Sequence, residues 1–203
     1  MRKEEKTQLT REKILNAAMA EFGEKGYSGG SLNNICSTGI PKGLLYHNFE
    51  NKDAIYLACI RQCFSAFTAF MRQQNPALSP DEYMKTRLHF FQENGSAARL
   101  FFEAILQPPL HLKEEIEEAK KDFDALNGEI YKNILSTVTL RSDVTEQEAM
   151  KYFSLMQYMF NGYFSSPAYT QMAFSDVMAA HEVNLSKLLD FMLYGIAERR
   201  KDQ

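Results

Sequence analysis

The sequence contains no tryptophan, only three cysteines and none of the common signatures of an active site. An odd number of cysteines forms no complete disulfide framework and is typical of a reducing compartment. No GxxxxGK[ST], GxGxxG, nucleophile-elbow or HExxH pattern occurs, which argues against an enzyme. We therefore expect a protein that acts by binding, with no catalytic residue, cofactor or metal ion.

Long hydrophobic runs are also missing. No apolar stretch approaches the roughly 20 residues that span a bilayer, and the first residues, MRKEEKTQLTREK, lack the apolar segment of a signal peptide. The expected location is therefore the cytoplasm. At 203 residues, with 45% hydrophobic and 24% charged residues, the chain has the composition of a globular protein with a substantial core.

Charge gives little guidance to a partner. The net charge is −3, with eight basic and seven acidic residues in positions 1–55 and a net −4 in the remainder. This asymmetry has the sign expected for a nucleic-acid-binding N-terminal region, but it is too small to identify one by itself.

Helical periodicity runs through most of the chain, and no stretch has the alternation of a strand. We predict an all-α fold of about nine helices, in which residues 1–51 form a three-helix N-terminal domain and residues 52–203 form a helical body. Residues 1–9 are expected to be a polar arm, with Thr10 as the N-cap of the first helix and Leu9 and Ile14 as its hydrophobic staple. The helices are expected at residues 10–26, 31–38, 41–49, 51–74, 79–94, 97–107, 110–138, 145–164 and 175–200.

Residues 31–57 carry the pattern with the clearest functional meaning. Ser31 is a good N-cap for a short helix, and Gly39 suits the left-handed conformation in which many helices end. Pro41 suits the first turn of a second short helix, in which Leu45 and Phe49 form the apolar side. Two short helices joined by a glycine turn, with hydrogen-bond donors on the second, indicate a DNA-binding helix-turn-helix.

The run Gly39-Ile40-Pro41-Lys42-Gly43-Leu44-Leu45-Tyr46-His47-Asn48-Phe49, followed by Lys52, resembles the signature of the tetracycline-repressor (TetR) family. The stretch from Thr10 to Ala18, together with Phe22, Gly26 and Tyr27, is similar to the first helix of that family. The resemblance covers residues 10–57. Two features depart from the family pattern: three residues rather than four separate Ile35 from Gly39, and Leu44 stands where Thr or Ser is usual.

The resemblance implies a ligand-responsive transcriptional regulator, a repressor by expectation, that binds a palindromic double-stranded DNA operator as a homodimer. The residues implied to contact DNA are Ser31, Lys42, Gly43, Leu44, Tyr46, His47 and Lys52. Lys42 and His47 would reach base edges or phosphates, and Gly43 would let the backbone approach the groove. Tyr46, Ser31 and Lys52 would contact phosphates.

The body is rich in aromatic residues and methionine, which fits either plain core packing or a pocket for a small apolar or aromatic effector. The candidate pocket residues are Phe90, Arg99, Phe102, Glu103, Gln157, Phe160 and Asn161. The last two long helices carry apolar residues on more than one face, which predicts a four-helix dimer interface. The candidate interface residues are Phe153, Phe160, His181, Leu185, Leu188 and Met192.

The alternative function is a helical ligand-binding or redox-sensing module with weakened or lost DNA binding. The shortened turn, Leu44 and the weak basic charge support it. Cys59 and Cys63 lie one helical turn apart and would be its sensor, although small buried side chains on an apolar helix explain the same pattern.

Overall fold

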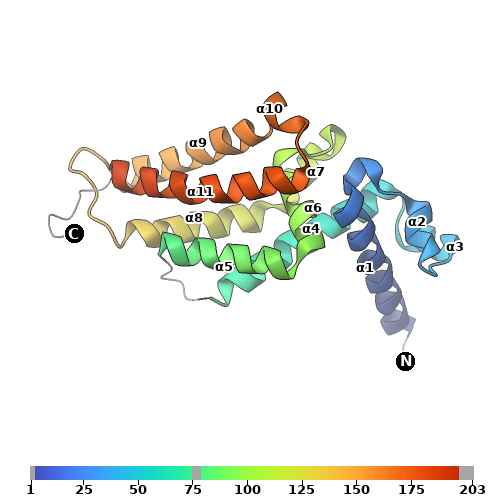
Figure 1. Ribbon diagram of the computed structural model, residues 1–203. Helices are drawn as coiled ribbons and strands as arrows, with labels where there is room; N and C mark the ends of the chain where they lie inside the picture. The colour runs from blue at the N-terminus through green and yellow to red at the C-terminus, as the bar shows by residue number, and fades with distance from the viewer. Residues whose placement is uncertain (1–2, 75–78, 197–203) are drawn as a thin grey trace. The chain divides into compact units, whose positions relative to one another are not determined.

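The computed structural model describes residues 3–74 and 79–196, and these residues form helices and no β-strand. Nine α-helices have seven residues or more, as predicted, and two shorter ones accompany them. The elements are α1 (Lys3–Gly29), α2 (Leu32–Ser37), α3 (Lys42–Asn48), α4 (Lys52–Arg72), α5 (Pro80–Glu93), α6 (Gly95–Leu106), a 3₁₀ turn η1 (Leu110–Leu112), α7 (Lys113–Ala119), α8 (Lys121–Leu135), α9 (Glu146–Phe164), α10 (Pro167–Thr170) and α11 (Phe174–Ile196) (Figure 1).

The chain divides into two compact units. Unit 1 comprises residues 1–66 and 91–121, and unit 2 comprises residues 67–90 and 122–203. The first 15 residues of α4 thus belong to unit 1 and the last six to unit 2. The predicted boundary between residues 51 and 52 falls inside unit 1, because α6 packs against α1 and completes its core.

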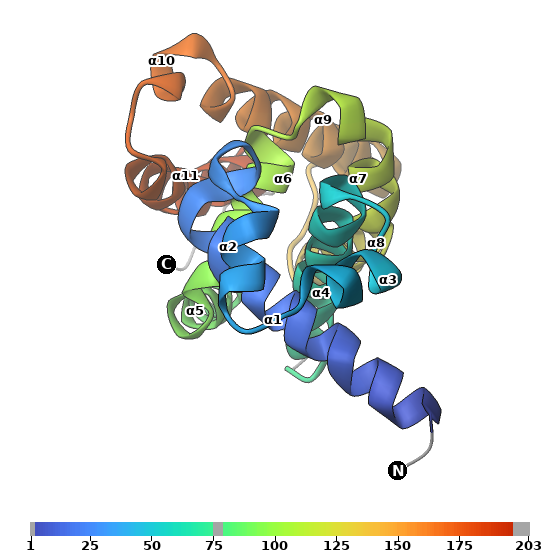
Figure 2. The same ribbon diagram turned by 90° about the vertical axis from the view of Figure 1, so that its right-hand side faces the viewer.

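Unit 1 is built around the apolar side of α1. Ile14, Ala18 and Phe22 are fully buried, as their spacing predicts, and α2 and α6 pack against this helix (Figure 2). The ring of Phe22 meets the ring of Tyr56, on α4, edge to face at 5.4 Å. The core of unit 1 therefore fixes α2 and α4 on one scaffold helix.

The start of α1 differs from the prediction. The helix already includes Lys3, so Thr10 is an interior residue and not an N-cap, and Leu9 is 46% exposed rather than part of a staple. Residues 3–9 contain no glycine or proline, and Gln8 donates a hydrogen bond to Glu12 one turn later. These features favour continuation of the helix. Residues 1–2 of the predicted arm lie outside the described residues.

The other end of α1 carries a kink at Gly26, where the helix was predicted to end. Gly26 has φ 69°, which other residues adopt only with strain. A side chain there would also collide with the carboxylate of Glu103, 2.6 Å from the ideal Cβ position. The backbone therefore turns at this point only because the residue is glycine.

Unit 2 is a helical body in which α9 and α11 pack against each other (Figure 1). Capping boxes begin two of the predicted helices: Ser79 caps α5 with Glu82, and Thr145 caps α9 with Glu148. The last four residues of the predicted final helix, 197–200, lie outside the described residues.

One predicted helix is two. The apolar residues of the helix predicted at 110–138 are divided between η1 with α7 and a separate α8. The break falls at Lys120, which has φ −95° and ψ 1°. Leu112 and Ile116 are buried in unit 1, whereas Phe123 and Leu126 are buried in unit 2. The apolar residues before and after Lys120 are thus buried in the cores of different units.

By length and composition alone, α4 would be able to cross a membrane, and it is the one such helix in the described part of the chain. Of its most apolar window, 56% is buried inside the protein. Much of its apolar surface is therefore used by the protein core.

Candidate nucleic-acid interface

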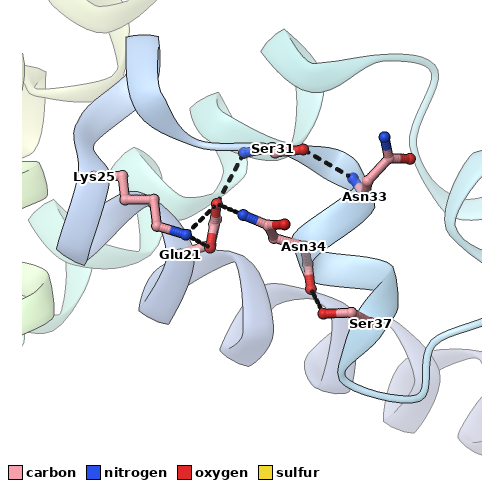
Figure 3. Close-up of polar contacts among 6 residues, drawn as sticks. All are labelled: Glu21, Lys25, Ser31, Asn33, Asn34 and Ser37. Carbon is pink, nitrogen blue, oxygen red and sulfur yellow. Dashed lines mark hydrogen bonds and ion pairs between the residues drawn. The ribbon is translucent and has the colours of Figure 1, made fainter.

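The N-terminus of α2 is held by a buried carboxylate. Glu21, on α1, accepts hydrogen bonds from the Lys25 ammonium (2.9 Å), the backbone N–H of Ser31 (3.0 Å) and the Asn34 amide (2.8 Å) (Figure 3). Burial by itself raises the pKa of Glu21, but these hydrogen bonds outweigh it and leave the pKa below its usual value. Ser31 is the predicted N-cap, and its hydroxyl accepts the N–H of Asn33 at 3.2 Å.

The turn between α2 and α3 has the predicted form. Gly39 has φ 95°, a conformation that favours glycine, and its N–H donates to the carbonyl of Cys36 at 3.1 Å. Pro41, which was predicted in the first turn of α3, is instead its N-cap and precedes the first helical residue by one position. The six residues of α2 and the single glycine in the turn account for the short spacing between Ile35 and Gly39.

The second helix is anchored on one side only. Leu45 is fully buried and Phe49 is 4% exposed, as predicted. Arg11, on α1, donates to the carbonyl of Asn48 at 3.2 Å, and its guanidinium lies 4.2 Å from the centroid of the Phe49 ring. A cation at the C-terminus of a helix also interacts favourably with the helix dipole.

The opposite side of α3 faces solvent. Leu44 is 38% and Tyr46 53% exposed. The remaining predicted contact residues of this helix, Lys42, Gly43 and His47, are exposed as well. Five of the seven predicted DNA-contacting residues therefore lie on α3 at exposed positions.

Residues at the start of α4, where a phosphate contact was expected, already make several contacts within the protein. The Lys52 ammonium lies 4.5 Å from the centroid of the Tyr27 ring, and Asn51 accepts the N–H of Ala54 at 2.8 Å. The Tyr27 hydroxyl donates to Asp53 and lies 3.1 Å from His111 Nε2. Burial and the Asp53 carboxylate raise the pKa of Tyr27 to about 12. One N–H of this helix terminus is thus already satisfied within the protein.

Glu103, one of the candidate pocket residues, holds the kink of α1. Its carboxylate accepts the backbone N–H of Tyr27 at 3.0 Å and the hydroxyl of Tyr56 at 3.0 Å. Burial raises the pKa of Glu103, and the hydrogen bonds from Tyr27 and Tyr56 lower it by less. The carboxylate therefore links α6 to α1 and α4.

Sequence reasoning missed the positioning roles of Glu21, Arg11 and Glu103. A signal for the first existed: Glu21 follows Ile14 and Ala18 at seven and three positions, and so lies on the apolar side of α1. Glu103 is likewise an acid within α6, a helix with six buried apolar residues. Charged residues at core-facing positions are rarely buried without partners.

The predicted effector residues do not all belong to one unit. Arg99, Phe102 and Glu103 lie in unit 1, whereas Phe90, Gln157, Phe160 and Asn161 lie in unit 2. Of these seven, only Gln157 lines the cavity found within unit 2, which has a volume of about 20 Å³. The cavity is lined by Tyr83, Asn127, Ile130, Tyr131, Ile134, Phe153, Gln157, Leu185 and Leu189.

Most of the predicted dimer residues are interior. Phe153, His181, Leu185 and Met192 are each less than 9% exposed within unit 2, which corrects their assignment to the interface. Phe160 and Leu188 are partly exposed. The sequence showed two apolar sides on α9, and the fold buries the one that contains Phe153. Exposed apolar side chains occupy the other side of α9 and one side of α11, at Tyr152, Leu155, Met159, Tyr163, Val183, Phe191 and Tyr194.

The two neighbouring cysteines are buried on α4. Burial raises the pKa of Cys59 to about 12 and raises that of Cys63 further, so little thiolate forms near neutral pH. Thiolate is the reactive form, and this environment disfavours a redox sensor. No group of three or more His, Cys, Asp or Glu side chains suited to a metal ion occurs in the described part of the chain.

Comparison with known proteins places these features in a family. The family described as "Bacterial regulatory proteins, tetR family" matches residues 14–59, which include α2, α3 and the start of α4. The biofilm operon icaADBC HTH-type negative transcriptional regulator IcaR of Staphylococcus epidermidis is 39% identical over 125 residues, which cover 60% of this chain and 68% of IcaR. The HTH-type transcriptional regulator RutR of Escherichia coli is 30% identical over 117 residues, 55% of each chain.

Solved structures share the fold over nearly the whole length. A transcriptional regulator FadR from Bacillus subtilis, solved in complex with stearoyl-CoA, has a TM-score of 0.62 and 19% identity over 91% of this chain and 98% of its own. A TetR family regulator from Cytophaga hutchinsonii has a TM-score of 0.62 and 19% identity over 96% and 98%. These structures show the fold, whereas the match to IcaR, together with the family match over residues 14–59, shows that this chain belongs to the tetR family of bacterial regulatory proteins.

Proposed function

We propose that the chain is a transcriptional repressor that binds a palindromic DNA operator as a homodimer and releases it in response to a small effector. The observation that carries this proposal is α3: a short helix anchored by Leu45 and Phe49 on one side, with its other side free to enter a major groove. The sign of regulation follows IcaR, a negative regulator by its name.

The exposed side of α3 offers several kinds of contact. The Lys42 ammonium and the His47 ring supply hydrogen-bond donors for base edges or phosphates, and Tyr46 supplies a hydroxyl for a phosphate. Gly43 leaves room for close backbone approach, since nothing lies within 4 Å of its ideal Cβ position. Leu44, in place of the usual Thr or Ser, presents methyl groups suited to the methyl group of thymine.

The two flanking helix starts complete the contact surface. The hydroxyl of Ser31 accepts a hydrogen bond from Asn33 and keeps its own proton for a phosphate oxygen. Lys52 adds positive charge at the N-terminus of α4, where the helix dipole favours an anion. Because the chain carries a net charge of −3, these local contacts are the main source of its affinity for DNA.

We propose that the dimer forms through the exposed apolar side of α9 and the adjacent α11. Tyr152, Leu155, Met159 and Tyr163 recur every three or four residues along α9, and the most exposed is Met159 at 65%. On α11, Phe191 is 72% exposed. Large side chains exposed in this way along two neighbouring helices mark an interaction surface, and a second copy supplies a matching one by symmetry.

DNA binding is tested with fluorescence anisotropy on DNA from upstream of the chain's own gene. Lys42→Ala and Tyr46→Phe are expected to weaken binding with little change in Tm. Each lost phosphate contact reduces the slope of log K against log salt by about 0.9. Lys85→Ala removes the same charge from an exposed position on α5 and is expected to bind like the parent. If both α3 variants also bind like the parent, the assignment of the recognition helix is wrong.

The dimer is tested by sedimentation. Met159→Glu and Phe191→Glu place a charge in the proposed interface and are expected to yield monomers at micromolar concentration. Tyr158→Glu is the matched control, since Tyr158 is 73% exposed on another side of α9. A parent protein that sediments as a monomer contradicts the proposed assembly.

A further inference from the structure

The cavity of unit 2 is bounded by four helices and is mostly apolar. Ile130 and Ile134 line it from α8, and Leu185 and Leu189 line it from α11. None of its nine lining residues carries a formal charge. At about 20 Å³ it has room for roughly one water-sized group.

One residue that lines this cavity, Tyr131, carries a buried hydroxyl. Tyr131 is 2% exposed, and its hydroxyl has no hydrogen-bond partner among the described residues. The ring of Tyr131 stacks on that of Phe153, with centroids 3.8 Å apart and planes 8° from parallel. A buried hydroxyl without a partner destabilises a fold, and beside a cavity such a hydroxyl is a donor that a ligand can use.

The polar part of the wall is held in place by buried charges. Tyr83 donates to the Asn127 side chain at 3.1 Å and contacts Arg87 one turn later on α5. Arg87 in turn pairs with Glu182 at 2.7 Å, and both side chains are at most 6% exposed. Glu182 also contacts the His181 ring, whose other nitrogen contacts Asn161, on α9. The wall beside Tyr131 is therefore fixed by a side-chain network that spans α5, α8, α9 and α11.

We propose that this cavity is the entry to the effector site and that the effector is a neutral, flat, ring-sized molecule with one hydrogen-bond acceptor. The Tyr131 hydroxyl supplies the donor. Apolar walls without a charged residue disfavour an ionic ligand. The parallel rings of Tyr131 and Phe153 suit a flat molecule that enters between them or stacks on them.

The present volume is too small for such a ring, so binding requires the Tyr131–Phe153 stack to part. Phe153 belongs to α9 and Tyr131 to α8. A ligand that parts them favours a different packing of α9, a helix of the proposed dimer surface. Only this last step rests on the proposed function, and ligand binding itself does not require DNA.

The test uses two probes of nearly equal shape, acetophenone and α-methylstyrene, of which only the first has an acceptor. Binding of each to the full chain, without DNA, is measured by calorimetry or ligand-observed NMR. Acetophenone is expected to bind about threefold to tenfold more tightly, and benzoate is expected not to bind. Tyr131→Phe is expected to abolish the preference for acetophenone and also to raise the Tm of the free protein.

Tyr158→Phe, the same chemical change at an exposed position of α9, is the control and is expected to keep the preference. The proposal is overturned if neither neutral probe binds at millimolar concentration, or if Tyr131→Phe keeps the parent's preference. It is also overturned if Tyr131→Phe lowers Tm, because the hydroxyl then serves a buried water. Probe binding without operator binding would instead refute the proposed function and leave this inference standing.

Discussion

Replacing Glu21 by Gln keeps the shape of the side chain almost unchanged but should weaken the hydrogen bonds that hold the start of α2. The carboxylate accepts from three donors: Lys25, Ser31 and Asn34. The Gln carbonyl can replace part of this, but its NH₂ group would face a donor, and the charge that strengthens the bond to Lys25 is lost. A loss of about 2 kcal/mol in the free energy of unfolding is expected, which corresponds to roughly 4–8 °C in Tm for a chain of this size.

Chemical denaturation and thermal melts of the parent, Glu21→Gln and Glu24→Gln measure this loss. Glu24 is exposed on the same helix, so its replacement changes the net charge equally without touching α2. Operator affinity should fall with Glu21→Gln as well, because Ser31 and α2 lose their anchor on α1.

The pH dependence separates the carboxylate from simple packing. The pKa of Glu21 is lowered in the folded protein, so the unfolded chain binds its proton more tightly and the stabilisation is complete only above the unfolded pKa of about 4.3. The difference between the parent and Glu21→Gln should therefore be full at pH 7 and shrink as pH falls below about 4.3 and through the lower folded pKa. Equal melting temperatures for the two Gln variants, or a difference unchanged at pH 3, would refute the reasoning.

Three further predictions concern other anchors of the fold. Arg11→Lys keeps the charge but loses the guanidinium that reaches the carbonyl of Asn48; operator affinity should fall, and stability should drop by about 1 kcal/mol, with Lys13→Ala as the control in the same assays. Burial raises the pKa of Cys59 to about 12, so Ellman's reagent at pH 8 should titrate one thiol quickly, that of Cys36, and the other two only after unfolding; three fast thiols would contradict this burial. Arg87→Met leaves the Glu182 carboxylate buried without its cation and should cost about 3–5 kcal/mol, most of which Arg87→Met with Glu182→Leu should restore in urea titrations.

Apart from the N-cap predicted at Thr10, several elements with local start and stop signals were predictable from the sequence. Ser79 and Thr145 carry the side chains that cap their own helices, and Gly39 carries the conformational freedom that its turn needs. These signals act between residues a few positions apart, so the local sequence is enough to predict where these helices begin and end. The same holds for Leu45 and Phe49, which the helical period places on one side of α3.

The sequence alone does not determine which residues far apart in the chain contact each other. Both sides of α9 are apolar, and only the packing of unit 2 decides that Phe153 is interior while Met159 is exposed. The link between Glu103 and Tyr27 joins residues 76 positions apart. The break at Lys120 has no glycine or proline to announce it, since it arises where successive turns of one stripe are buried in different units.

The break at Lys120 affects the exchange of backbone amide hydrogens with solvent. Within a continuous helix, the amides near position 120 would be protected from hydrogen exchange by bonds to carbonyls four residues earlier. Here the Lys120 amide still donates to the carbonyl of Ile116, four residues earlier, at 3.1 Å, but a new helix begins at the next residue. The first amides of a helix lack such carbonyl partners. A short window of fast exchange should therefore interrupt slow exchange on both sides, so that units 1 and 2 can unfold locally in separate steps.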